Sequence, residues 1–258
     1  MFQGLPRVAS RLVMVILALF LAACSGQVDP APGAINDPYE RLNRRFHESS
    51  KKSDRRVLRP VAVAYATTVP PAMQESISNF RLNLATPGIV LNDLLQFRAE
   101  DAIVNTYRFA VNTVVGLGGL VDVAGQFGVP ARETDFGATL HFWRVKEGAY
   151  LELPVLGPMT ERDLAGRVGD IALNPLGYLL PTPERYYVSG AGIGTRVLDR
   201  LGKRGRFAGA VDSVLYDSVD SYAQTRNAYL QKRRYELRRG ATVGEDPYAE
   251  IYSDPYAE

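Results

Sequence analysis

Cysteine and histidine are nearly absent from this chain, whose 258 residues include one Cys and two His. A lone thiol cannot build a disulfide framework, so Cys24 needs another purpose. His47 and His141 lie far apart in the sequence, and neither stands in a metal-ligating or Ser-His-Asp pattern. We therefore expect no catalytic residue, no metal and no cofactor. Paired carboxylates are the one catalytic alternative that the residues leave open.

A strong charge of one sign is also lacking, because Lys and Arg number 30 against 28 for Asp and Glu, a net charge of +2. So slight an excess argues against a nucleic-acid partner. The first apolar stretch, from Leu12 to Ala23, is too short to cross a membrane: it spans about a dozen residues, and a spanning helix needs about 20. We therefore interpret it as a cleaved export signal.

The residues around that stretch are typical of a lipoprotein signal peptide. Arg7 and Arg11 precede it, and Leu21-Ala22-Ala23-Cys24 closes it as a lipobox. We expect cleavage before Cys24 and lipid attachment to its thiol, the alternative being an uncleaved short membrane anchor. Ser25 stands where an Asp would favour inner-membrane retention. The predicted location is therefore the periplasmic leaflet of an outer membrane.

The sequence divides into four predicted parts. They are a signal peptide over 1–23, a flexible linker over 24–35, a helical domain over 36–239 and a disordered acidic tail over 240–258. The tail repeats Asp-Pro-Tyr-Ala-Glu, and a repeat so short, acidic and proline-broken cannot bury a core.

The domain is predicted to be mainly α-helical. Asn36-Asp37-Pro38 is typical of a helix start, and Tyr39, Leu42 and Phe46 follow at helical spacing as an apolar face. We expect the charged stretch from Lys51 to Arg56 to end this first helix. Further helices are predicted after Arg59-Pro60, after Pro70-Pro71, from Thr86-Pro87, over Ala99 to Val115, from Thr160, from Thr195, from Phe207 and over Val219 to Arg239.

Two local signals refine this pattern. Thr160 with Asp163 resembles a capping box and predicts the start of a helix. Within Thr139 to Leu153, apolar residues flank a turn at Lys146-Glu147-Gly148. We expect the one β-hairpin of the chain there.

The helix over Ala99 to Val115 carries an unusual polar stripe. Asp101, Asn105, Arg108 and Asn112 recur at steps of four, three and four, so they share one narrow face, and the residues around them are apolar or small. A helix that is apolar nearly all round is buried or in lipid, and a polar stripe within it suggests a wet path. The alternative is a core helix with one exposed edge.

Many ordered blocks of the sequence resemble one family, the MlaA (VacJ) family of phospholipid-transport lipoproteins. The resemblance runs from about Asn36 to Arg234. Its blocks are Asn36-Asp37-Pro38-Tyr39-Glu40-Arg41-Leu42-Asn43-Arg44, Arg59-Pro60-Val61-Ala62-Val63-Ala64-Tyr65, Ser78-Asn79-Phe80, Asn83-Leu84, Arg108-Phe109-Ala110-Val111-Asn112-Thr113, the segment 116–124, Asp135-Phe136-Gly137-Ala138-Thr139-Leu140, Leu153-Pro154-Val155-Leu156-Gly157-Pro158 and the segment 226–231.

This resemblance implies a ring-like bundle of amphipathic helices embedded in one leaflet, with one short β-hairpin and a central channel. It implies partners as well: phospholipid, an outer-membrane porin trimer and a soluble periplasmic carrier similar to MlaC. The channel would give a use to Asp101, Asn105, Arg108 and Asn112, because a lipid headgroup is costly to bury without polar partners. Some of these four residues could instead cap or tie neighbouring helices.

The chain departs from the family pattern at three places. His47 to Asp54 replaces an apolar stretch, so this part of the first helix should lie near headgroups. Arg144 and Lys146 replace glycines, which puts in doubt a family hinge that would include Gly148. Ser221 stands in place of a proline.

One further hypothesis stays open beside lipid transport. The chain could be a structural envelope lipoprotein that binds porin or other envelope proteins through the basic stretch from Lys232 to Arg239, and transports nothing.

Overall fold

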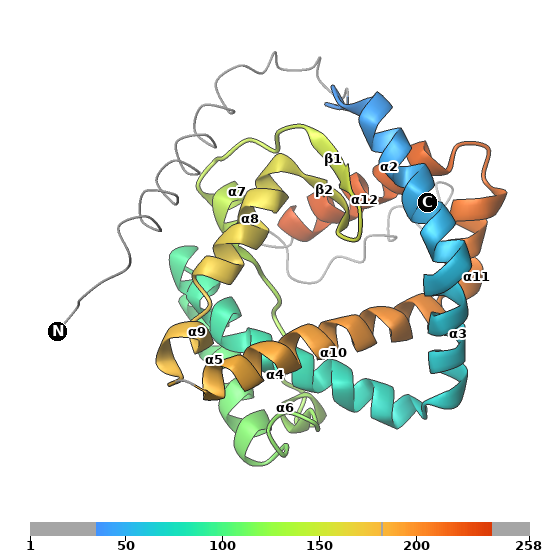
Figure 1. Ribbon diagram of the computed structural model, residues 1–258. Helices are drawn as coiled ribbons and strands as arrows, with labels where there is room; N and C mark the ends of the chain where they lie inside the picture. The colour runs from blue at the N-terminus through green and yellow to red at the C-terminus, as the bar shows by residue number, and fades with distance from the viewer. Residues whose placement is uncertain (1–34, 182, 239–258) are drawn as a thin grey trace, which may run out of the picture.

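The computed structural model describes residues 35–181 and 183–238, mainly as helices arranged in a ring-like outline (Figure 1). The helices are α2 (Glu40–Ser53), α3 (Arg59–Thr68), α4 (Pro71–Leu95), α5 (Ala99–Val114), α6 (Val123–Gln126), α7 (Phe136–Phe142), α8 (Glu161–Ala172), α9 (Leu176–Leu179), α10 (Glu184–Arg206), α11 (Ala208–Asp212) and α12 (Ser221–Arg238), with π-helical turns η1 (Asp54–Leu58) and η2 (Ser213–Asp217). The predicted signal peptide, Cys24, nearly all of the linker and the acidic tail lie outside the described residues.

The ring is built from helices that pack mostly in pairs. Helix α10 packs against α3 and α4, α4 against α5, and α7 against α8. The N-terminal helix α2 packs against the first strand, and α12 packs against η2 and the second strand. The predicted mainly helical fold with one short β-hairpin is therefore confirmed.

The prediction that Lys51 to Arg56 ends the first helix is wrong. Helix α2 continues through η1 into α3 without a break. Asp54, the first residue of η1, is buried and accepts hydrogen bonds from Arg204 Nε at 3.0 Å and from Tyr216 at 2.6 Å. A π-turn re-aims a side chain without ending the helix, and here a carboxylate on that turn reaches partners far along the chain.

The prediction of a separate helix from Thr86-Pro87 is also wrong, because Pro87 lies inside α4. A proline removes one intrahelical hydrogen bond and usually kinks or breaks a helix. Thr86 Oγ1 donates to the carbonyl of Leu82 at 2.8 Å, and α4 packs against both α5 and α10. Tertiary packing therefore overrides the local breaker.

The β-hairpin lies later in the sequence than predicted: the segment expected as its second strand is the first strand. Strand β1 (Tyr150–Leu153) pairs antiparallel with β2 (Gly157–Thr160), so the turn is Pro154-Val155-Leu156 and not Lys146-Glu147-Gly148. The residues expected as the first strand form α7 instead. That helix starts because the Asp135 carboxylate accepts the Ala138 amide hydrogen at 2.7 Å, which makes Asp135 an N-cap.

Two predicted helix boundaries are confirmed. Helix α5 covers Ala99–Val114, and Gly118 and Gly119 follow it with positive φ. The Thr160 hydroxyl accepts the Asp163 amide hydrogen at 3.2 Å and opens α8, as the capping signal indicates.

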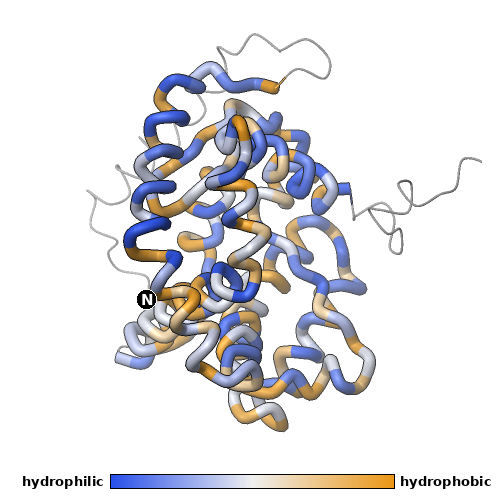
Figure 2. The backbone as a smooth tube through the Cα atoms, turned by 90° about the vertical axis from the view of Figure 1, so that its right-hand side faces the viewer, coloured by the Kyte–Doolittle hydropathy of each residue, from blue (hydrophilic) through white to orange (hydrophobic). Residues whose placement is uncertain are grey.

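The distribution of polar and apolar side chains is inverted relative to an ordinary globular protein. Among the described residues, 20 polar or charged side chains are buried against 9 hydrophobic ones. In α2 the buried side chains are Asn43 and His47, whereas Tyr39 and Leu42 of the predicted apolar face are exposed. Figure 2 shows hydrophobic residues spread along the whole tube, including its lower end. Exposed apolar surface on this scale calls for an apolar partner.

In the described part of the chain, none of the helices combines the length and the hydropathy that crossing a membrane requires.

We predict that Arg144→Gly stabilises the fold. Arg144 follows α7 with a φ of 64°, where the amides of Arg144 and Val145 donate to the carbonyls of His141 and Leu140, each at 2.9 Å. A left-handed conformation costs an L-residue about 1–2 kcal/mol. Glycine avoids this strain, but part of the gain is lost because glycine has more conformational freedom in the unfolded chain. The expected net gain is about 0.5–1 kcal/mol, measured by thermal unfolding in detergent.

Lys146→Gly is the matched control for that change. It also introduces a glycine into this loop, but Lys146 does not have a positive φ. We expect no gain in stability from it, and an equal gain from both variants would show that strain at Arg144 is not the cause.

Candidate functional site

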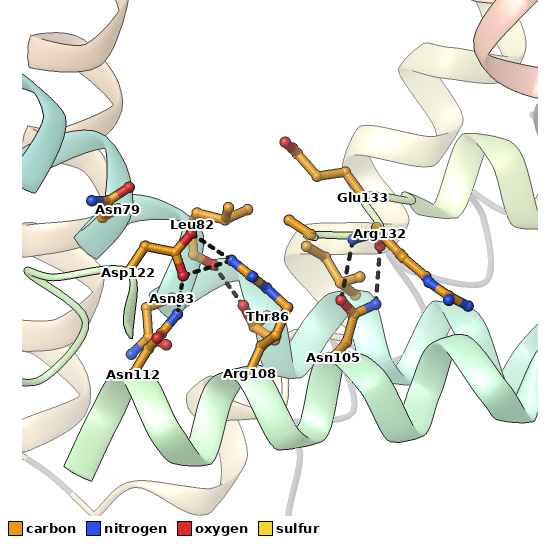
Figure 3. Close-up of a pocket in the computed structure, with 12 residues that line it drawn as sticks. Asn79, Leu82, Asn83, Thr86, Asn105, Arg108, Asn112, Asp122, Arg132 and Glu133 are labelled. Carbon is orange, nitrogen blue, oxygen red and sulfur yellow. Dashed lines mark hydrogen bonds and ion pairs between the residues drawn. The ribbon is translucent and has the colours of Figure 1, made fainter. Parts of the chain in front are cut away.

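The polar stripe of α5 faces inward. Asp101, Asn105, Arg108 and Asn112 are all buried, and Figure 3 shows the last three pointing from α5 toward α4 and the segment that holds Asp122 and Arg132. On the other side of the same helix, Ile103 is 70% exposed. The wider apolar surface of α5 therefore faces outward. Its inner face carries the four stripe residues, which together with their partners form the α5 seam.

Asp122 is the carboxylate around which one end of this seam is organised. Arg108 Nη2 donates to both carboxylate oxygens of Asp122 at 2.9 Å, and Asn112 Nδ2 donates to one of them at 2.8 Å. Burial raises the pKa of Asp122, but these hydrogen bonds and that from the Gly125 amide outweigh it and hold the pKa below its ordinary value. Asn112 also accepts the amide hydrogen of Ala124 at 2.9 Å.

The other end of the seam is tied to α4 and to Arg132. Asn105 Nδ2 donates to Asp93 Oδ2 at 2.7 Å and to the backbone carbonyl of Arg132 at 2.9 Å. Asp101 forms an ion pair with Arg98 and accepts a hydrogen bond from Arg132. All four residues of the predicted stripe thus tie α5 to its neighbours, which is one of the two roles that the sequence leaves open.

A small cavity lies along this seam (Figure 3). Its volume is about 10 Å³, which is room for no more than about one water. The residues that line it are Asn79, Leu82, Asn83, Thr86, Ile89, Asn105, Arg108, Asn112, Asp122, Ala131, Arg132 and Glu133. Three of the four stripe residues are in this set and Asp101 is not. In this conformation the seam is polar but closed to a lipid headgroup.

Asp93 is the most deeply buried carboxylate of the seam, with 0% of its surface exposed. Burial raises its pKa to about 6, and the hydrogen bond from Asn105 lowers it only in part. Its Oδ1 has no hydrogen-bond partner among the described residues. The charged form of this side chain is therefore poorly accommodated in the fold.

The three residues of the predicted hinge lie between α7 and β1. Arg144 and Lys146 are exposed, and Gly148 has a φ of 75° with the Glu161 side chain directly against it. A hinge at these positions stays a prediction.

Sequence reasoning missed a buried array on the opposite side of the ring. His47 Nδ1 lies 2.7 Å from Glu152 Oε1, and His47 Nε2 lies 3.0 Å from Ser221 Oγ. No motif could have indicated this array, because its members come from α2, β1 and α12.

This array resembles a Ser-His-acid triad in its distances, but its surroundings fit a structural tie. All three side chains are buried. None of them lines the cavity along α5 or the surface hollow on α2 that Arg44, Arg45, Glu48, Ser49 and Lys52 form. The Asp220 carboxylate accepts the Ala223 amide hydrogen at 3.0 Å, so that donor beside Ser221 is taken and does not point to an oxyanion. The array holds α2, β1 and α12 together.

Within residues 35–181 and 183–238, no group of three or more His, Cys, Asp and Glu side chains has an arrangement that could hold a metal ion.

Comparisons with known proteins converge on one family. The sequence model of the MlaA lipoprotein matches residues 35–236. The intermembrane phospholipid transport system lipoprotein MlaA of Shigella flexneri is 33% identical over 224 residues, 85% of this chain and 86% of that protein. An uncharacterised protein of Rickettsia conorii is 33% identical over 205 residues, 79% of each chain.

A solved structure is similar as well. It is described as a structural basis for maintenance of bacterial outer membrane lipid asymmetry, and it matches with a TM-score of 0.65 at 31% identity. The match covers 78% of this chain and 98% of that one.

We predict that Asp93 makes the fold less stable as pH rises. Its folded pKa of about 6 lies above the ordinary value, so its contribution is most favourable below about pH 4 and is lost between pH 4 and 6 as the buried carboxyl ionises. The unfolding free energy of the wild type should therefore fall by on the order of 2 kcal/mol between pH 4.5 and 7.5 because of Asp93. In Asp93→Asn this contribution to the fall should be absent.

Asp122→Asn serves as the control for the pH experiment. The pKa of Asp122 is lowered, so its stabilisation is present above about pH 4 and is lost only below that. This variant should be less stable at both pH values but keep the wild-type difference between them. If Asp93→Asn keeps that difference too, Asp93 does not titrate in this window.

Proposed function

The chain belongs to the MlaA lipoprotein family, and from that membership we propose that it is a lipid-anchored outer-membrane component of intermembrane phospholipid transport. In this proposal it removes mislocalised phospholipid from the outer leaflet, passes it on to a soluble periplasmic carrier similar to MlaC, and so maintains lipid asymmetry. It does this without covalent chemistry. An outer-membrane porin trimer is the proposed membrane partner.

The observation that carries the proposal is the inverted polarity of the ring. Many large apolar side chains are exposed, and most of the buried side chains are polar or charged. In water such an arrangement is unfavourable, because the apolar surface stays exposed to solvent, whereas lipid tails would cover it. The interior then supplies what a phospholipid headgroup lacks among those tails, which is a set of hydrogen-bond partners.

We propose that the α5 seam is part of the headgroup path and that Asp122 closes it. The Asp122 carboxylate accepts the hydrogen bonds of Arg108 and Asn112 that the phosphate group of a lipid could accept instead. Carboxylate and phosphate are both anions whose oxygens can bind a guanidinium. A headgroup would exchange with Asp122 for these two partners when the segment containing Asp122 moves away from α5. The small size of the cavity requires such a movement.

The scaffold alternative loses part of its docking surface in this structure. Two basic residues of α12 are engaged with other elements of the chain. Arg233 donates to Asp163 and to Asp135, each at 2.9 Å, and Arg234 pairs with Glu147 at 3.1 Å. Arg233 is largely buried by these contacts. They favour a structural role for this helix over the binding of an outside partner.

We predict that neutralising the Arg108–Asp122 pair abolishes lipid transport. The double variant Arg108→Gln with Asp122→Asn removes both charges and leaves a neutral amide at each position, so no buried ion is left unpaired. Outer-leaflet phosphatidylethanolamine, labelled on intact cells with a membrane-impermeant amine reagent, should rise several-fold at normal protein level.

A second ion pair of the ring provides the matched control. Arg44 and Asp220 form a two-point pair at 3.0 and 2.8 Å, far from the seam, and Arg44→Gln with Asp220→Asn neutralises it in the same way. Lipid asymmetry should stay at the wild-type level in this control. If asymmetry is also intact in the Arg108 and Asp122 double variant, the seam is not the path.

We also predict that the domain stays in the membrane without its lipid. The chain is exported behind a leader that is cleaved before Ser25, so that Cys24 and its acyl chains are absent. Because the exposed apolar side chains remain, this form should stay with the membrane fraction at high salt and require detergent for release. A protein that is recovered in the soluble periplasmic fraction would support the scaffold alternative.

A further inference from the structure

One short motif of the sequence has no part in the proposed function. The tripeptide Asp-Pro-Tyr occurs three times in the chain, at residues 37–39, 246–248 and 254–256. The first copy lies directly before α2, and the other two lie in the acidic tail, outside the described residues. The contacts of the first copy therefore indicate what this motif can bind.

The carboxylate of Asp37 is held in a site between α2 and α12. Its side chain is only 4% exposed. Asn43 Nδ2 donates to Oδ1 at 3.0 Å, Arg226 Nη1 donates to Oδ2 at 2.6 Å, and the Tyr222 hydroxyl also donates to Oδ2. These three side chains form the Asp37 site. Since each contact is a hydrogen bond to one carboxylate, another aspartate presented in the same way can accept all of them.

The residues before Asp37 make backbone and apolar contacts. The Tyr150 amide donates to the carbonyl of Asn36 at 2.8 Å, as it would to a peptide added to the edge of a strand. Ile35 packs against the buried cluster that contains Tyr150 and Tyr222. A second occupant of this site therefore needs a backbone carbonyl one residue before its aspartate and a hydrophobic or aromatic side chain two residues before it.

The last copy of the motif meets both requirements. Tyr252 and Ser253 precede Asp254, so an aromatic side chain stands two residues before the aspartate. In the copy at 246–248 that position is Gly244, which has no side chain to pack. Both tail copies continue with Ala-Glu, whereas Glu40 follows the first copy directly, so the similarity ends at the tyrosine. Residues 252–256 are the better match.

The tail is long enough to reach the Asp37 site of its own molecule. Helix α12 ends at Arg238, and Arg226 lies twelve residues earlier, about 18 Å back along the helix. An extended chain spans at most about 3.3–3.6 Å per residue, so the sixteen residues from Arg238 to Asp254 cover up to about 55 Å. The tail can therefore turn back along α12 with length to spare.

The charges of the tail and of the site are complementary. Residues 240–258 contain five Asp or Glu and neither Lys nor Arg. Arg44 Cζ lies 4.6 Å from the centroid of the Tyr222 ring, and Arg226 Nε has no hydrogen-bond partner among the described residues. Attraction to these cations, together with the short tether, raises the local concentration of the tail at the Asp37 site.

Asp37 can leave its site without unwinding α2. That helix begins at Glu40, and its N-cap residue is Tyr39, whose carbonyl accepts the amide hydrogens of Leu42 and Asn43. Residues 35–37 precede these bonds. Within the backbone at the helix start, their exchange for another peptide breaks only the 3.3 Å bond from the Glu40 amide to the Asp37 carbonyl.

We propose that residues 252–256 of the tail bind the Asp37 site of the same molecule, with Asp254 in place of Asp37. The tail is then a competitor that releases residues 35–37, which join α2 to the predicted linker and lipid anchor. Release lengthens the free connection between the anchor and the ring. The proposal goes beyond lipid transport and does not depend on it.

Photo-crosslinking tests where the tail binds. In the full lipidated protein, in vesicles of phosphatidylethanolamine and phosphatidylglycerol, Tyr252 is replaced by benzoylphenylalanine. Irradiation, digestion and mass spectrometry should then find residue 252 joined to Tyr150 or to residues 222–230 of the same molecule. Crosslinks found only to lipid, to other parts of the ring or to a second molecule, which doubles the mass on a denaturing gel, would overturn the proposal.

Two tail variants separate the motif from charge alone. Asp246→Asn with Asp254→Asn removes the aspartate from both tail copies. Glu245→Gln with Glu250→Gln removes the same number of charges and leaves both copies complete. The yield of the crosslink should fall about fivefold or more in the first pair, because charge-assisted hydrogen bonds are lost, and change less than twofold in the second. An equal fall in both pairs would show unspecific attraction and contradict the proposal.

Asp37→Asn tests the competition itself. This change weakens the occupant seen in the structure, so the crosslink yield of the tail should rise several-fold. An unchanged yield would mean that the tail does not compete with Asp37. The proposed function fails separately, since normal lipid asymmetry in the Arg108 and Asp122 double variant removes the headgroup path and leaves the tail contact standing.

Discussion

Ion pairs between arginine and carboxylate side chains hold the ring together, because the described residues bury few apolar side chains. Arg204 reaches Asp54 across 150 positions of sequence, with both contacts at 3.0 Å or less. Arg233 joins α12 to Asp163 of α8 and to Asp135 at the start of α7. The buried hydrophobic cluster of the described residues has only Tyr150, Tyr222 and Leu230 as members. Directional polar contacts thus do the work that a hydrophobic core does in a protein dissolved in water.

This constraint explains why so many of these contacts form networks. An isolated buried charge is very costly, and a buried pair becomes favourable only when additional hydrogen bonds satisfy the remaining atoms. Asp163 therefore accepts from Thr160 at 2.7 Å and from Tyr229 as well as from Arg233, and Asp54 accepts from Tyr216 as well as from Arg204. Such networks specify which helices meet, because a different arrangement would leave these buried charged groups without their hydrogen bonds.

The same constraint connects the inside of the ring to its outside. Side chains that satisfy one another inside leave the apolar faces of the helices outward, and the turns between helices then present Phe97 or Trp143 where a soluble protein would place small or polar residues. The α5 seam shows both consequences on one helix. Its polar edge binds Asp122 and Asp93, and Ile103 on the other edge is exposed. A closed seam of this kind has to open before it can admit a headgroup, and the groups that close it are those that a phosphate would bind.

Local signals in the sequence were sufficient for the helical content, for the bounds of α5, for the Thr160 cap and for the family, because each depends on neighbouring residues or on an ordered pattern. They failed at Pro87, where packing of α4 overrides a helix breaker, and at residues 136–142, where the Asp135 cap turned an apolar run into a helix. Periodicity placed Asp101, Asn105, Arg108 and Asn112 on one face, but it could not say what that face meets. Only the tertiary structure brought Asp122 to Arg108 and joined His47, Glu152 and Ser221, since a side chain's partner depends on how distant segments pack.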